Sequence, residues 1–154
     1  MADALLAAVA GLPGRAATGV MPLPIVLGAV LGGLLVLVAG RWNRAGETQL
    51  LALGLVVAAL IYIVLALAGG ADRRWLALET AGLAIFGGLA WLGLRVSLWW
   101  LALGWVTHVG WDVGLHLDRT QAFVSPWYPL LCVGFDLVVA GFLLGRASAG
   151  QPGR

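Results

Sequence analysis

The stretch TQLLALGLVVAALIYIVLALA, residues 48–68, decides the fold of this chain. It contains no charged residue, and its few polar side chains are Thr48 and Gln49 at one end and Tyr62 toward the other. About 20 consecutive apolar residues are enough for a helix to cross the hydrocarbon core of a bilayer. Backbone that faces lipid must satisfy its own hydrogen bonds, and a helix does so. The stretch therefore predicts a transmembrane helix.

Comparable apolar segments fill most of the remaining sequence. The chain has 154 residues, of which 62% are hydrophobic and 10% charged, and its mean hydropathy is +1.00. These values lie outside the range of soluble globular domains. Arginines and turn residues divide the chain into predicted spans at residues 22–40, 48–68, 75–94, 96–117 and 126–145. We predict an all-α integral membrane protein, residues 1–154 forming a single domain, with a bundle of five transmembrane helices joined by short loops.

The two ends and the charges give further expectations. Residues 1–14 lack the positive start of a signal peptide and are expected to form a stub at the membrane interface. Residues 147–154 are expected to form a disordered tail. The nine basic residues are all arginine and are spread over the loops, so no nucleic-acid partner is expected. The expected partners are the lipid bilayer and either further copies of the chain or a larger membrane complex.

A second stretch, GWVTHVGWDVGLHLD at residues 104–118, places ionisable side chains in an apolar segment. Such groups are costly at membrane depth and usually have partners and a function. His108, Asp112 and His116 are spaced by four residues, so they share one broad face of a helix. Eight residues rise about 12 Å along a helix. His108 and His116 therefore cannot both ligate one ion without distortion, and a compact site needs residues from other helices.

Alignment of the predicted spans by depth supplies those residues. If the last two spans form a hairpin, the residues at equal depth are His108 with Asp136, Asp112 with Cys132, and His116 with Tyr128. The tight turn near Arg95 brings Glu79 level with Trp111 and Asp112, and Tyr62 falls in the same layer. We therefore expect the buried polar groups to gather in one half of the bilayer.

The stretches GWVTHVGWDVGLH and PWYPLLCVGFDLVVAGF, preceded by a span with a glutamate, resemble a family of small bacterial integral-membrane proteins classed as a domain of unknown function. Members often carry a second histidine beside the last one, where this chain has Leu115 and Leu117. The resemblance implies a multi-pass protein of the bacterial cytoplasmic (inner) membrane, and it implies no activity. The residues that carry it are His108, Trp111, Asp112, His116, Cys132 and Asp136.

The favoured hypothesis for the site is a divalent transition metal within the bilayer. Imidazole and carboxylate ligands suit zinc, iron or manganese. An open coordination position would polarise a water molecule or a lipid-borne substrate. Whether the chain is an enzyme is left open. The predicted ligands form two lobes, His108 and Asp136 with Asp112 in one and Glu79 with His116 in the other. The predicted supporting residues are Tyr62, Trp111, Cys132 and Tyr128.

Two other hypotheses account for the same residues. In the first, the carboxylates and histidines form a proton or ion path through the membrane. In the second, aspartate–histidine pairs fix the packing of the helices, and the chain is a structural or accessory subunit. The sequence shows no P-loop, dinucleotide-binding fingerprint or Ser-His-Asp arrangement that would favour another chemistry.

Overall fold

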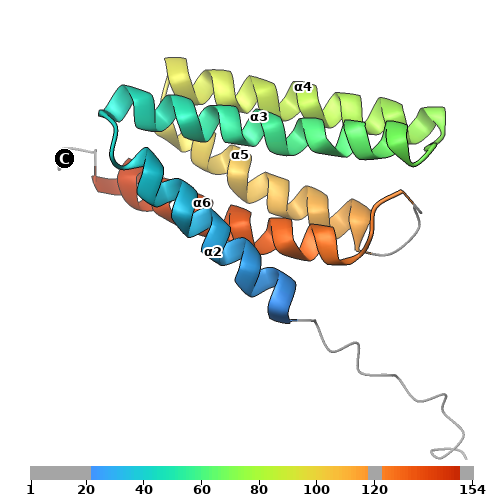
Figure 1. The fold of residues 1–154 in the computed structure, drawn as a ribbon. Helices are drawn as coiled ribbons and strands as arrows, with labels where there is room; N and C mark the ends of the chain where they lie inside the picture. Colours follow the sequence, from blue (N-terminus) through green and yellow to red (C-terminus); the bar gives the residue numbers. More distant parts are fainter. Residues whose placement is uncertain (1–21, 118–122, 150–154) are drawn as a thin grey trace, which may run out of the picture.

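The computed structural model describes residues 22–117 and 123–149, and all regular secondary structure within these ranges is helical (Figure 1). The predicted interfacial stub at residues 1–14 lies outside the described residues. The last helix includes residues 147–149, which the sequence assigned to the tail, and residues 150–154 are again outside. The elements are α2 (Pro22–Ala39), α3 (Arg44–Ala68), α4 (Arg73–Arg95), α5 (Leu98–Trp111), the π-helical turn η1 (Asp112–His116) and α6 (Trp127–Ala149).

Polar caps set the first residues of three helices. The side chains of Asn43, Asp72 and Ser97 each accept a hydrogen bond from a backbone amide in the first turn of α3, α4 and α5. The cap at Asn43 explains why α3 begins before the apolar stretch does. Gly70 has a φ of 67°, the left-handed conformation that glycine adopts easily, in the tight turn between α3 and α4.

Three helices of the described chain, rather than five, are individually long and apolar enough to cross a membrane: α3, α4 and α6. Helix α2 is apolar but shorter. The fourth predicted span is interrupted, because α5 ends as an α-helix after 14 residues and continues as the π turn η1. Large apolar side chains nevertheless cover the outer surface of all five helices, for example Val30, Val64, Trp91, Val106 and Leu137.

The helices pack in the order α3, α4, α5, α6 and α2, with α2 crossing over α6 (Figure 1). Helix α2 thus contacts α6, the last helix, more extensively than it contacts α3, its neighbour in the sequence. Buried apolar side chains from all five helices form one core. Within it the indole of Trp105 donates a hydrogen bond of 3.3 Å to the carbonyl oxygen of Leu51, which joins α5 to α3.

Glycines permit the close crossing of α2 and α6. A Cβ atom at Gly28 would lie 1.9 Å from the carbonyl oxygen of Leu131, and one at Gly134 would lie 2.0 Å from that of Ile25. Small residues of this kind let helix backbones approach closely in membranes. The sequence also offers Gly110 and Gly114 at contact spacing, but a Cβ atom at either would meet no described atom within 4 Å.

An ion pair joins the start of α3 to the last turn of α6. Nη2 of Arg146 donates to Oε2 of Glu47 at 2.7 Å, and the Glu47 side chain is buried. The sequence interpretation missed this pair. Its signal was a glutamate and an arginine near the same ends of two antiparallel spans.

Candidate metal centre

The centre of the polar cluster consists of His108 on α5, Asp112 at the start of η1 and Asp136 on α6. Nδ1 of His108 lies 2.7 Å from Oδ2 of Asp136 and 3.5 Å from Oδ2 of Asp112. All three side chains are at most 1% exposed. One potential ligand atom from each lies within 4.8 Å of the others. The hairpin of α5 and α6 therefore brings together the three residues that the depth alignment places in adjacent layers.

These distances are compatible with a shared metal ion. A tetrahedral ion with bonds of about 2.0–2.2 Å holds its ligand atoms roughly 3.3–3.6 Å apart. The separation between His108 and Asp112 already falls in this range. The shorter separation between His108 and Asp136 is that of a hydrogen bond, and it would have to lengthen by less than about 1 Å. Small side-chain rotations are enough for this change.

Two atoms of the centre have no hydrogen-bond partner among the described residues. They are Oδ2 of Asp112 and Nε2 of His108, and both are fully buried. A buried polar atom without a partner costs about 1–3 kcal/mol, and more when it is charged. A cation near Asp112 would supply the missing partner. The phenyl edge of Phe86, with its centroid 4.7 Å from that of the imidazole, packs against His108.

Glu79, Trp111 and His116 form a second polar group beside this centre. Nε1 of Trp111 donates to Oε2 of Glu79 at 3.2 Å, and Nε2 of His116 lies 3.3 Å from Oε1 of Glu79. The second contact has the distance of an ion pair but lacks hydrogen-bond geometry, and neither ring nitrogen of His116 has a hydrogen-bond partner within the described chain. The predicted ligands are thus divided between two groups.

Tyr62 on α3 lies between the two groups and contacts both. Its hydroxyl donates a hydrogen bond of 2.6 Å to Oδ1 of Asp112. Its ring stacks on the imidazole of His116, with centroids 4.1 Å apart and planes 10° apart. The stacked contact carries no hydrogen bond, so the two groups share a packing residue rather than a continuous hydrogen-bonded path.

The π turn at Asp112–His116 is the local feature that the sequence interpretation missed. A π turn closes hydrogen bonds between residues i and i+5, and such turns occur often at functional sites. His108 and Asp112 belong to regular α-helical spacing, whereas His116 lies after the wide turn. The widening changes the direction in which His116 points relative to an unbroken α-helix. Nothing in the local composition distinguishes this segment from the helix before it.

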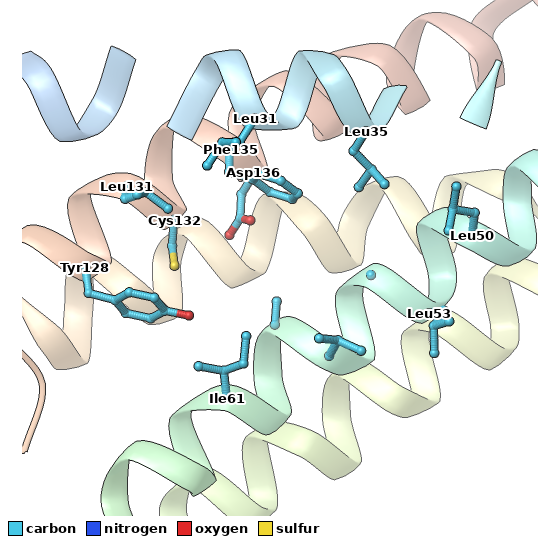
Figure 2. Close-up of a pocket in the computed structure, with 13 residues that line it drawn as sticks. Leu31, Leu35, Leu50, Leu53, Ile61, Tyr128, Leu131, Cys132, Phe135 and Asp136 are labelled. Carbon is cyan, nitrogen blue, oxygen red and sulfur yellow. The ribbon is translucent and has the colours of Figure 1, made fainter. Parts of the chain in front are cut away.

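The remaining predicted residues, Cys132 and Tyr128, lie on α6 at the wall of a cavity that Asp136 also lines (Figure 2). The cavity has a volume of about 420 Å³ and lies between α2, α3 and α6. Cys132 is not one of the three residues whose ligand atoms converge. The ring of Tyr128 packs edge-on against Tyr62, with centroids 5.7 Å apart.

Comparison with known proteins places this arrangement in an uncharacterised group. The model of a family of unknown function, DUF6010, matches residues 23–149. No match is found among curated proteins or among solved structures. The matched range contains every residue of the polar cluster.

Proposed function

Because the chain belongs to the DUF6010 family, whose function is unknown, we propose its function from the site itself. The protein is a multi-pass membrane protein that binds a divalent transition metal ion, namely zinc, iron or manganese, through His108, Asp112 and Asp136. The observation that carries the proposal is the convergence of one ligand atom from each residue within 4.8 Å, with Oδ2 of Asp112 buried and without a hydrogen-bond partner in the described chain.

The membrane assignment rests on the outer surface and on the position of the cluster. Three helices are long and apolar enough to span a bilayer, and α5 with η1 extends the fourth helical segment over Leu98–His116. Large apolar side chains on all five helices are exposed. A soluble protein rarely exposes contiguous apolar surface on this scale. We propose that all five helical segments cross the membrane, which places the centre in one half of the bilayer.

Charge balance favours a divalent cation at the centre. Asp112 and Asp136 are buried side by side, and the described arginines lie at or beyond helix ends. Two ionised carboxylates with a neutral imidazole carry two negative charges, which a divalent ion neutralises. Without a cation, at least one carboxylate must take up a proton or the imidazole must be charged, because isolated charges are very costly in an apolar interior.

The described side chains would hold the ion and leave part of its coordination shell open. Three protein ligands are typical of catalytic rather than structural zinc sites, and a bound ion would supply Lewis acidity at the open position. Tyr62 orients Asp112 through its hydrogen bond, and the ring of Phe86 packs against the imidazole of His108. Partners of this kind fix ligand orientation in metal sites.

The two alternatives have weaker support. The described side chains do not form a connected proton path, since Tyr62 meets His116 through stacked rings. A purely structural role would pair His108 with Asp136 and leave Oδ2 of Asp112 with the 3.5 Å ion-pair contact to His108 but without a hydrogen bond in the described chain.

Elemental analysis of the purified protein tests the proposal. We expect about one transition metal ion per chain in the wild type, and loss of that ion in Asp136→Asn, since an amide binds such metals poorly. Asp72→Asn is the matched control, because Asp72 caps α4 outside the cluster and asparagine is an equally good cap. A wild-type protein with no bound metal, and with no gain in thermal stability from zinc, iron or manganese, would exclude the metal site.

A further inference from the structure

The cavity between α2, α3 and α6 is apolar over most of its length and polar at one side. Figure 2 shows the carboxylate of Asp136, the thiol of Cys132 and the hydroxyl of Tyr128 directed into the space between α6 and α3. The other walls are formed by aliphatic and aromatic side chains and one glycine, which are Leu31, Leu35, Leu50, Leu53, Gly54, Val57, Ala58, Ile61, Leu131 and Phe135.

The cavity is accessible from the outer surface of the bundle. Leu53 and Val57 of α3 line it while being 58% and 43% exposed, and Leu31 of α2 lines it while being 41% exposed. Helix α2 leaves this side open because it packs mainly on α6, which the close approach at Gly28 permits. In a bilayer this outer surface faces hydrocarbon, so a molecule reaches the cavity laterally from the membrane.

We propose that this cavity binds a single-chain lipid with a neutral, hydroxyl-bearing head, with the hydrocarbon chain along α2 and α3 and the hydroxyl at Asp136. The inference rests on the proposed function in one respect, that Asp136 belongs to the metal centre. The volume of about 420 Å³ falls within the roughly 300–1,000 Å³ of typical ligand pockets. Since Asp136 belongs both to the cavity wall and to the proposed centre, the inference assigns a membrane lipid as the substrate class of that centre.

The chemistry of the polar wall selects the head. A carboxylate or phosphate head would add an uncompensated negative charge in an apolar cavity, because the divalent ion already balances Asp112 and Asp136. An amine head would compete with the divalent ion for the same carboxylates. A hydroxyl donates to a carboxylate oxygen and accepts from the phenol of Tyr128, so it satisfies both groups that line this wall. The polar groups come from one short segment of α6, which fits a small head on one chain.

Photolabelling of the full-length protein in bilayer nanodiscs tests the inference. The probe is a long-chain primary alcohol with a diazirine near the middle of its chain. We expect labelled peptides from α2, α3 and α6 at residues that line the cavity. Ala58→Phe, which adds a ring inside the cavity, should lower this labelling at least about tenfold, equivalent to ~1.4 kcal/mol of binding. Ala81→Phe on the exposed face of α4 is the matched control and should label like the wild type.

The outcomes separate this inference from the metal proposal. Labelling that is spread evenly over the outer surface, or that is equal in Ala58→Phe and Ala81→Phe, overturns the lipid site. A photoreactive residue at Ile61 that captures residues 1–21, or a second copy of the chain, instead of the alcohol also overturns it. Cavity-specific labelling in a protein that contains no metal and gains no thermal stability from zinc, iron or manganese supports the lipid site and refutes the metal centre. Wild-type labelling needs no variant to fold, so the inference stays testable if Ala58→Phe is unstable.

Discussion

The hydroxyl of Tyr62 donates a 2.6 Å hydrogen bond to Oδ1 of Asp112, and this contact joins α3 to the first residue of the π turn. It holds the carboxylate so that its other oxygen, Oδ2, faces Nδ1 of His108 at 3.5 Å. The proposed ligand is therefore oriented by a residue fifty positions earlier in the chain. A hydrogen bond of this kind fixes the orientation of a metal-ligating side chain before the ion binds.

Tyr62→Phe should weaken metal binding while keeping the stacked ring. Loss of an outer hydrogen bond to a ligand typically costs about 10–100-fold in metal affinity, and we expect a loss in that range by competition with a fluorescent chelator. Tyr128→Phe is the matched control, because its hydroxyl has no hydrogen bond to any of the three proposed ligands in the described structure. Equal affinities of the two variants would show that Tyr62 does not position Asp112.

Metal binding and stability should change together at Asp112. Removal of the ion from the wild type with a chelator should lower the melting temperature, because a ligand present at 100 times its Kd stabilises by about 2.7 kcal/mol. Asp112→Asn should melt like the chelated wild type and should not respond to the chelator, since the amide keeps the bond to Tyr62 but lacks the anionic ligand. If the chelator leaves the wild-type melting temperature unchanged, Asp112 is not part of a metal site.

Glu79→Gln should leave the metal ion at His108, Asp112 and Asp136 in place. Glu79 contacts Trp111 and His116, whereas the converging ligand atoms belong to His108, Asp112 and Asp136. Glutamine retains an oxygen that accepts from the Trp111 indole. We therefore expect unchanged metal content by elemental analysis. Loss of the ion in Glu79→Gln would instead show that Glu79 is one of its ligands.

Gly28→Ala should destabilise the fold, because the new Cβ atom would clash with the backbone of α6 at Leu131. Overpacking of this kind usually costs about 1–3 kcal/mol. Gly33→Ala, on the same helix, has no atom within 4 Å of its new Cβ atom and should be neutral or stabilising by up to about 1 kcal/mol. Thermal denaturation in one detergent measures the difference. Similar melting temperatures for the two variants would contradict the close crossing of α2 and α6.

Single cysteines on a Cys132→Ala background should determine whether α5 and η1 cross the membrane. Ser97 precedes α5 and Ser125 precedes α6. Substitution of cysteine at either position replaces a hydroxyl with a thiol of similar size. If the segment crosses, a membrane-impermeant maleimide should label Ser97→Cys and Ser125→Cys from opposite sides of sealed vesicles. Labelling of both cysteines from the same side would refute the proposal that all five helical segments cross the membrane.

The sequence predicts which residues of the polar cluster are neighbours, because antiparallel helical hairpins determine which residues lie at the same depth. His108 meets Asp136, Trp111 meets Glu79, and Tyr62 reaches the same layer. These contacts follow from helical rise and short connections alone. Depth leaves the rotation of each helix undetermined, so the sequence could not predict that the ring of Tyr62 stacks on His116 between the two groups.

Other features depend on packing that the sequence pattern does not encode. Gly28 and Gly110 occur in similar small-residue spacings, yet only Gly28 meets a described neighbouring helix. The preference of α2 for α6 over α3 pairs residues far apart in the sequence, such as Gly28 and Leu131, and no periodicity specifies such a contact. The cavity beside Asp136 is a consequence of that choice. The predicted length of the fourth span is affected similarly, because hydropathy does not distinguish a π turn from an α-helix.

The π turn at Asp112–His116 accommodates one residue more than an α-helical turn would. Each hydrogen-bonded ring of the turn contains one residue more than an α-helical ring. Deletion of Gly114, which has open space around it, would remove the extra residue and restore ordinary α-helical spacing. Because the wide turn already absorbs that residue, His116 would stay close to its present direction toward Glu79, whereas a deletion in the regular helix before Asp112 would rotate the following residues of that segment by about 100°. The π turn therefore lets the segment contain one more residue without changing which partners His108 and His116 face.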